Sequence, residues 1–268
     1  MLAEKYFPRN SGRYGRLAAI AKKMDGFAAL NPERWFGIWA MVLAGANVSA
    51  YLEDRWLYWE WSTFSYFLVS IMVIALVWDK FMFRFPLFPQ KVDSIKSASF
   101  MLLTGFALFF LGTIPAGFDP LVFAYGLPYF IFFVVAHLTY AIPIKENEKG
   151  ERSVPEKSEM TLPLAIIIGL TIITATAGVL HDDPIISTIS AVYLPFPLVA
   201  LIFPSAVRHL QRCRAYVVFI PVMFIAVRFP WFLFMVLPLF WILRHYNYFR
   251  HGVVSPSFKV DLPDGNDG

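Results

Sequence analysis

The residues best suited to chemistry in this sequence are charged side chains in short polar segments between long apolar runs. Segment 78–96 combines charges of both signs with two prolines, and segment 208–214 contains three arginines. Arginine and lysine bind phosphates and carboxylates through charge-assisted hydrogen bonds. The charged residues of these two segments are therefore the candidates for an anion-binding site, namely Asp79, Lys80, Arg84, Lys91, Asp93, Arg208, Arg212 and Arg214.

Other kinds of site have little support in the sequence. No His, Cys, Asp or Glu cluster has metal-ligand spacing, and zinc-protease, GXSXG and phosphate-loop motifs are absent. Cys213 is the single cysteine, which excludes an internal disulfide. The apolar runs contain almost no ionisable residue apart from His137, which argues against a proton-coupled transporter or an ion channel. No metal or other cofactor is predicted.

The composition is that of a membrane protein. Hydrophobic residues make up 58% of the chain, charged residues 16%, and the mean hydropathy is +0.58. Soluble domains have roughly 45–50% apolar and about 25% charged residues. No soluble domain is left over that could bind nucleic acid. The expected location is an integral, multi-pass position in a membrane, with the bacterial inner membrane as the expected compartment, and the expected partners include membrane lipids.

The apolar runs predict an all-α transmembrane bundle, because a membrane-spanning helix needs about 20 apolar residues. Six spans are predicted at residues 35–52, 62–78, 97–114, 121–143, 160–180 and 185–207, the last of them kinked by Pro195, Pro197 and Pro204. Residues 215–243 are either one tilted span or two short helices hinged at Arg228-Phe229-Pro230. The first span carries Ala40, Ala44, Gly45, Ser49 and Ala50, small residues that permit close helix packing.

The distribution of basic residues decides between these two topologies. Of the 23 Lys and Arg, all except Arg55 and Arg228 lie in segments 1–34, 79–96, 145–159, 208–214 or after residue 243. Basic residues favour the cytoplasmic side of a membrane. Eight spans with both termini cytoplasmic put every one of those segments inside, so the hairpin is preferred for residues 215–243.

Three regions are predicted along the chain. Residues 1–34 form a basic cytoplasmic arm, which is either an amphipathic helix on the lipid headgroups or a solvated segment. Residues 35–250 form one transmembrane helical domain, and residues 251–268 form a short cytoplasmic tail.

The order of these elements resembles the UbiA superfamily of intramembrane prenyltransferases. The first span opens NPERWFGIWAMVLAGA, and Trp78-Asp79-Lys80 is followed by a basic and proline-rich loop, Arg84-Phe85-Pro86-Leu87-Phe88-Pro89. The family's Tyr-X-X-Pro at the end of the fourth span is similar to Tyr140-Ala141-Ile142-Pro143, followed by Lys145. The resemblance implies a UbiA-like bundle and an isoprenoid ligand, and it adds Tyr140 and Lys145 to the candidate site.

The sequence departs from this family at the residues that bind metal. Family enzymes hold a prenyl diphosphate through Mg²⁺ and two aspartate-rich motifs, because Mg²⁺ needs hard oxygen ligands. Here only Asp79 and Asp93 remain in the first loop, and segment 208–214 has no carboxylate. Standard Mg²⁺-dependent prenyl transfer is therefore not expected, and Mg²⁺ would be needed only if that activity were retained.

Three functional interpretations stay open. The chain is a UbiA-like protein that binds an isoprenoid or anionic lipid, with Arg84, Lys91, Arg208, Arg212 and Arg214 on the phosphate. Alternatively it is a non-catalytic structural or assembly subunit of a membrane complex. In the third interpretation the basic loops only set the topology by facing anionic lipid.

Overall fold

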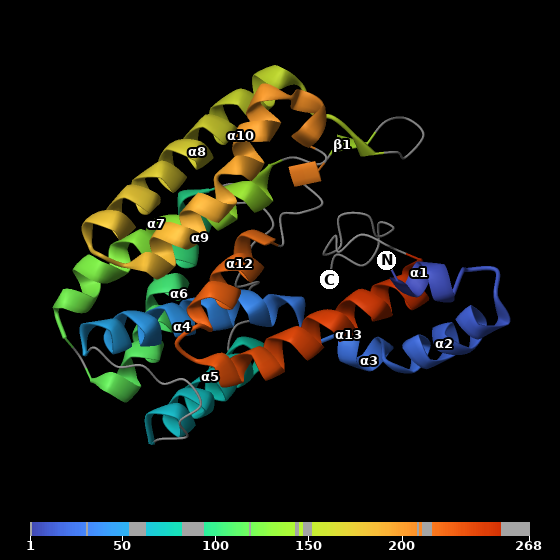
Figure 1. Cartoon of the computed structure of the whole chain (residues 1–268), viewed down its shortest axis with the longest axis horizontal. Helices are drawn as coiled ribbons and strands as arrows, with labels where there is room; N and C mark the ends of the chain where they lie inside the picture. Colours follow the sequence, from blue (N-terminus) through green and yellow to red (C-terminus); the bar gives the residue numbers. More distant parts are fainter. Residues whose placement is uncertain are drawn as a thin grey trace.

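The chain is helical through most of its length, as the computed structural model shows (Figure 1). The structure describes residues 2–30, 32–53, 63–81, 94–117, 119–142, 145–146, 152–207, 209–210 and 216–252. Within these described ranges, five helical segments are long and apolar enough to cross a membrane, which is what an integral membrane protein requires. These five segments are Trp35–Leu52, Ile95–Thr113, Leu121–Ala141, Lys157–Leu180 and Pro184–Ile202.

The elements follow the predicted order of spans. Three short helices precede the first span: α1 (Leu2–Tyr6), α2 (Gly12–Lys23) and α3 (Asp25–Ala28). The remaining helices are α4 (Glu33–Leu52), α5 (Thr63–Phe81), α6 (Ile95–Thr113), α7 (Leu121–Ala141), α8 (Lys157–Leu180), α9 (Pro184–Tyr193), α10 (Pro195–Ile202), α12 (Tyr216–Ile225) and α13 (Leu233–His251). Single 3₁₀ turns lie at Ile114–Ala116, Pro204–Ala206 and Pro230–Phe232. Two-residue strands β1 (Lys145–Glu146) and β2 (Arg152–Ser153) pair antiparallel between α7 and α8.

Prolines divide two of the predicted spans. The helical run after Pro184 breaks into α9 and α10 at Pro195, where a kink was expected. The ambiguous segment 215–243 is two helices, because α12 ends at Ile225 and a 3₁₀ turn starts at Pro230. The second of these helices, α13, continues past the predicted end at residue 243 to His251. The hinge therefore lies where Arg228-Phe229-Pro230 predicted it.

Helix α4 is the centre of the bundle. Its apolar window is 78% buried, whereas those of α6 and α8 are only 28% buried. Figure 1 shows α4 running through the middle of the molecule, with α6, α7 and α12 around it. The predicted small-residue face makes this possible: a Cβ added to Gly45 would lie 1.9 Å from the Phe109 carbonyl oxygen of α6. The backbones of α4 and α6 thus touch directly.

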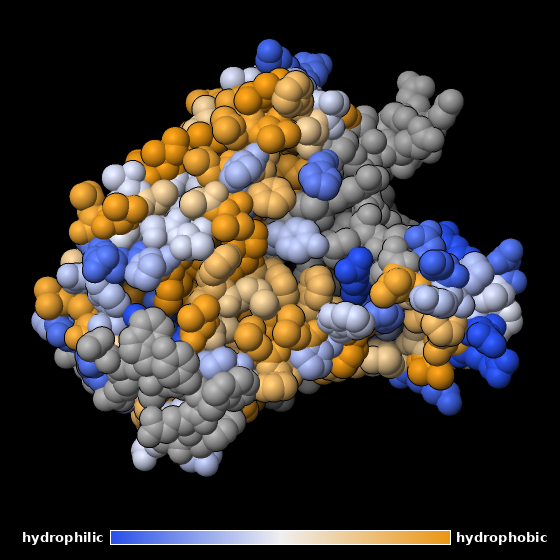
Figure 2. Space-filling model, in the orientation of Figure 1, coloured by the Kyte–Doolittle hydropathy of each residue, from blue (hydrophilic) through white to orange (hydrophobic). Residues whose placement is uncertain are grey.

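Part of the arm is helical, and Tyr14, Leu17 and Ala21 of α2 pack against α13. Tyr14 donates a hydrogen bond to the carbonyl oxygen of Tyr248 (3.0 Å), and their rings meet edge to face. Asp25 pairs with Arg250 (3.0 Å) and accepts a hydrogen bond from the Tyr246 hydroxyl (2.8 Å). We call Tyr14, Asp25, Tyr246, Tyr248 and Arg250 the arm–helix clasp. Figure 2 shows hydrophilic residues gathered around these helices and hydrophobic ones over α8 and α10.

The contacts within the clasp shift the pKa values of Asp25 and Tyr246. Hydrogen bonds from Arg250 and Tyr246 hold the pKa of the Asp25 carboxyl below its usual range. Burial, together with the hydrogen bond to Asp25, raises the pKa of the Tyr246 hydroxyl to about 12. Asp25 therefore stays ionised and Tyr246 stays protonated at neutral pH.

Candidate functional site

Most of the predicted anion site lies outside the described part of the chain. This holds for Arg84, Lys91, Asp93, Arg208, Arg212 and Arg214. Asp79 and Lys80 lie in the last turn of α5, and Lys145 opens β1; their side chains are also outside the described set. Tyr140 is half-buried in the last turn of α7 and packs on the hydrophobic core. The predicted proximity of the two basic loops thus lies outside the described residues.

A different polar group lies inside the bundle. The side-chain amide nitrogen of Asn47 in α4 donates to the Tyr129 hydroxyl oxygen of α7 (2.7 Å). The Tyr129 hydroxyl in turn donates to Oδ2 of Asp183 (2.8 Å), at the start of α9. All three side chains are at most 4% exposed. Polar groups are costly to bury in a membrane protein unless they are hydrogen-bonded, and they are rarely there without a function. This buried polar chain is therefore a candidate site.

Asp183 is held in place by the helix that it caps. Its Oδ1 accepts from the backbone N–H of Ile185 (3.0 Å) and of Ile186 (3.4 Å), and Pro184 takes the first helical position. Aspartate at the cap and proline directly after it both favour a helix start. The residue before it, Asp182, has a left-handed backbone (φ 53°), which turns the chain sharply between α8 and α9.

A buried arginine lies at the same end of the bundle. Arg228, in the hinge between α12 and α13, is 2% exposed, and its guanidinium lies 5.5 Å from the centre of the Tyr51 ring. Tyr51 donates to the carbonyl oxygens of His181 (2.9 Å) and Asp182 (3.1 Å). Tyr51 therefore contacts both Arg228 and the turn that contains Asp183. Together these contacts tie α4, the α8–α9 turn and the hinge.

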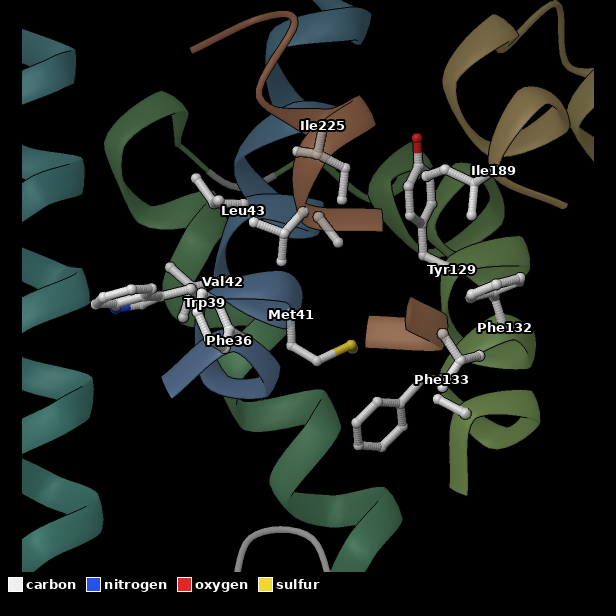
Figure 3. Close-up of a cluster of buried hydrophobic side chains, with 14 of the residues drawn as sticks. Phe36, Trp39, Met41, Val42, Leu43, Tyr129, Phe132, Phe133, Ile189 and Ile225 are labelled. Atoms are coloured by element: carbon white, nitrogen blue, oxygen red, sulfur yellow. The ribbon is translucent and has the colours of Figure 1, made fainter. Parts of the chain in front are cut away.

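A narrow apolar pocket extends from this polar group between α4, α7, α9 and α12. Its cavity volume is about 30 Å³. Gly37, Ala40, Ala44 and Ala136 provide the room because their side chains are small or absent. Figure 3 shows Met41 and Ile225 facing Tyr129 and Phe133 across this space. We call this narrow apolar cavity the slot.

The donor set of the described residues is not suited to a metal. No group of three or more His, Cys, Asp or Glu in the described ranges could hold an ion. The buried His137 hydrogen-bonds through Nδ1 to the Phe133 carbonyl oxygen (2.9 Å), one turn back in α7. What the arrangement offers is a hydrophobic wall with hydrogen-bonding groups at one end.

The polar group was missed in the sequence analysis, although each member left a signal. Asn47 is a lone amide in an apolar span, Asp183-Pro184 is a helix-start pair, and Arg228 interrupts an apolar run. Arg228 was predicted only as part of the hinge and as one of two basic residues on the outer side. Its burial makes it a candidate functional residue, because buried ionisable groups often lie at functional sites.

Comparison of the chain with known proteins adds no family. No family model, no curated protein and no solved structure matches it. The resemblance to the UbiA superfamily therefore stays a prediction.

Proposed function

We propose that this chain is a UbiA-like integral membrane protein that binds an isoprenoid or anionic lipid without the metal-binding aspartates of active prenyltransferases. The observation that carries the proposal is the apolar slot between α4, α7, α9 and α12. Its wall is apolar and rich in small residues, which is the kind of lining that hydrocarbon chains contact. The buried groups at its end supply the polar contacts that fix a ligand's orientation.

The arrangement of helix ends supports the eight-span topology with both ends cytoplasmic. The clasp joins the arm before α4 to the end of α13, so these two segments lie on one side. At the other end, Tyr51 meets the α8–α9 turn, and Phe64 of α5 stacks on Phe229 of the hinge. Eight passes satisfy both groupings when α9 and α10 count as one. In this topology α5 and α7 end on the arm's side, which brings Asp79, Lys80 and Lys145 there.

The basic loops would hold an anionic headgroup on that same side. In the sequence, Arg84 and Lys91 follow α5, whereas Arg208, Arg212 and Arg214 follow α10. Because segment 208–214 contains no carboxylate, it attracts phosphate without a bridging Mg²⁺. Any catalytic activity would therefore differ from Mg²⁺-dependent prenyl transfer.

Lipid analysis of purified variants tests the proposal. Ala40→Leu fills the slot and should remove co-purified isoprenoid, while the pair Arg84→Ala and Arg212→Ala should remove anionic lipid. The matched control is Arg55→Ala, which deletes a basic residue that the topology puts on the other side. Mass spectrometry gives the lipid profile of each variant. Unchanged profiles in both the slot and the loop variants contradict the proposal.

A second candidate, a structural or assembly subunit of a membrane complex, is favoured by the outer face of α13. Phe234 and Trp241 are 70% and 60% exposed and lie seven residues apart with Leu237 between them. This spacing forms a stripe along one side of a helix. The stripe borders a groove of about 570 Å³ with an entirely apolar lining. Photo-crosslinking from position 237 in native membranes separates the candidates: a protein adduct supports the subunit role, and lipid adducts alone contradict it.

A further inference from the structure

Basic residues of the arm gather on the side of α2 that faces away from α13. Arg13, Arg16 and Lys23 are exposed there, and Ile20 between them is 55% exposed. Their spacing of three, four and three residues forms one stripe along a helix. We call these four residues the outward stripe. None of its basic members pairs with a carboxylate in the described part of the chain.

The opposite, apolar side of α2 is already occupied. It shares a small hydrophobic cluster with the end of α13, formed by Tyr14, Leu17, Ala21, Tyr248 and Phe249. Ala21 is only 4% exposed, so this side is closed to lipid. An amphipathic helix on a membrane normally buries its apolar face at the boundary of the acyl chains. In this conformation α2 can meet a membrane only through the outward stripe.

Two tryptophans mark the level of the membrane surface near the arm. Trp35 opens the apolar stretch of α4, and its ring meets that of Phe27 in α3 edge to face (5.9 Å). In α13, Trp241 is 60% exposed and lies three residues before Arg244. Tryptophan concentrates at the boundary between hydrocarbon and water. The clasp begins at Tyr246, about 7.5 Å beyond Trp241 along the helix axis, which is the level of the lipid headgroups.

The charge of the stripe fits an anionic surface. Basic residues near a membrane that contains anionic lipids are attracted to it, and arginine also binds phosphate through paired hydrogen bonds. Residues 2–30 contain six basic and two acidic residues, and one of the acidic residues, Asp25, is paired with Arg250. Helix α2 itself contains no acidic residue that would oppose binding. Figure 2 shows hydrophilic residues covering this end of the molecule.

We propose that the outward stripe of α2 binds the anionic phospholipid headgroups of the leaflet beside it. Arg13, Arg16 and Lys23 contact the lipid phosphates, and Ile20 enters the headgroup layer between them. This surface is separate from the basic loops of the proposed function and does not depend on them. Because the clasp fixes α2 against α13, binding at the stripe also stabilises the packing of the arm on the last helix.

The test measures how closely α2 approaches lipid headgroups. The full-length protein with Cys213→Ser carries a fluorophore on Ala19→Cys, an exposed position beside the stripe. It is placed in nanodiscs of phosphatidylcholine, some of which bears a nitroxide on its headgroup. We expect quenching by the nitroxide to rise when phosphatidylglycerol replaces part of the phosphatidylcholine. High salt should reverse the rise, because salt screens exposed charges.

Two variants, each lacking one exposed charge of the arm, make the result specific. Arg16→Gln removes a charge of the stripe and should raise the amount of phosphatidylglycerol needed for half-maximal quenching by about fivefold. Lys5→Gln removes an exposed charge from α1 and should leave that amount nearly unchanged. Equal shifts in the two variants would mean that only the net charge of the arm matters, and they would overturn the proposal.

The response of the unmutated stripe decides the remaining case. Quenching that does not change with phosphatidylglycerol means that the stripe is solvated, which also overturns the proposal. The pair Arg84→Ala and Arg212→Ala should leave the quenching of the α2 label unchanged. A negative result at α2 therefore leaves the proposed function standing, since that function is tested by the lipids that co-purify with the loop and slot variants.

Discussion

The contact between α4 and α6 predicts a large effect from one added methyl group. In Gly112→Ala the new Cβ would lie 1.8 Å from the carbonyl oxygen of Val42 and 3.0 Å from the backbone nitrogen of Ala46. Ordinary contact begins at 3.4 Å, so the backbones must separate by about 1.6 Å. No side-chain rotation can relieve this clash, because the opposing atoms belong to the backbone of α4.

The size of the effect follows from two opposing terms. Overpacking a tight interface costs typically about 1–3 kcal/mol. The better helix propensity of alanine over glycine returns roughly 0.5–1 kcal/mol. Since rigid backbone lies opposite Gly112, we take the upper part of the overpacking range and expect a net loss near 2 kcal/mol. In Gly105→Ala the neighbour is the Phe133 ring at 2.6 Å, which can move, so a smaller loss is expected.

Equilibrium unfolding in mixed micelles, followed by circular dichroism, measures these differences. Gly169→Ala in α8 is the matched control, since nothing lies within 4 Å of its added Cβ; it should be neutral or slightly stabilising. The double variant of Gly45 and Gly112 should cost less than the sum of the single ones, because one separation of the helices relieves both. If Gly112→Ala unfolds like Gly169→Ala, the reasoning about this crossing is refuted.

Three further predictions concern polar residues and topology. Tyr129→Phe should destabilise the protein by about 1–3 kcal/mol in the same unfolding assay, because it leaves Oδ2 of Asp183 without its donor and the Asn47 amide nitrogen without its acceptor. Tyr125→Phe is its control, and equal stability of the two would contradict the hydrogen-bond chain. The pKa of Asp25 is lowered from 3.8 in the folded state. The ionised Asp25 therefore stabilises the fold above pH 3.8, and this stabilisation is lost as the pH falls through the folded-state pKa. Hydrogen exchange of α2 should rise over that acidic window, and Asp25→Asn should remove this dependence; a profile unchanged by the substitution would exclude Asp25 as its cause. In a Cys213→Ser background, cysteines at positions 150 and 255 should label from the same side of the membrane, and labelling from opposite sides would rule out an even number of spans.

Local signals in the sequence predicted the helices well. Long apolar runs predicted α7 and α8 to within a few residues, and Pro195 and Pro230 predicted the breaks in later helices. The small-residue face around Gly45 predicted a close helix contact, though not that α6 would supply the partner. Such features follow from length, periodicity and proline chemistry, all of which are visible in one sequence.

The buried polar group could not be predicted in the same way. Asn47 and Tyr129 are 82 residues apart, and Tyr129 and Asp183 are 54 apart. Nothing local relates them, because their pairing depends on which helices become neighbours. The predicted site instead consisted of segments in which charged residues are dense. The structure buries its polar atoms where charges are sparse, and there each one needs a specific partner.

The arm–helix clasp has a consequence for how the chain inserts into a membrane. Asp25 and Arg250 are separated by every helix from α4 to α12, and they meet only if those helices return the chain to its starting side. In the proposed eight-span topology, failure of one helix to insert makes the number of crossings odd, and the two halves of the clasp end in different compartments. The loss of any one span would then open the clasp, however far that span lies from it in the bundle. In that topology Asp25 and Arg250 meet only when an even number of spans has inserted, and an exposed α2 would mark chains with an odd number.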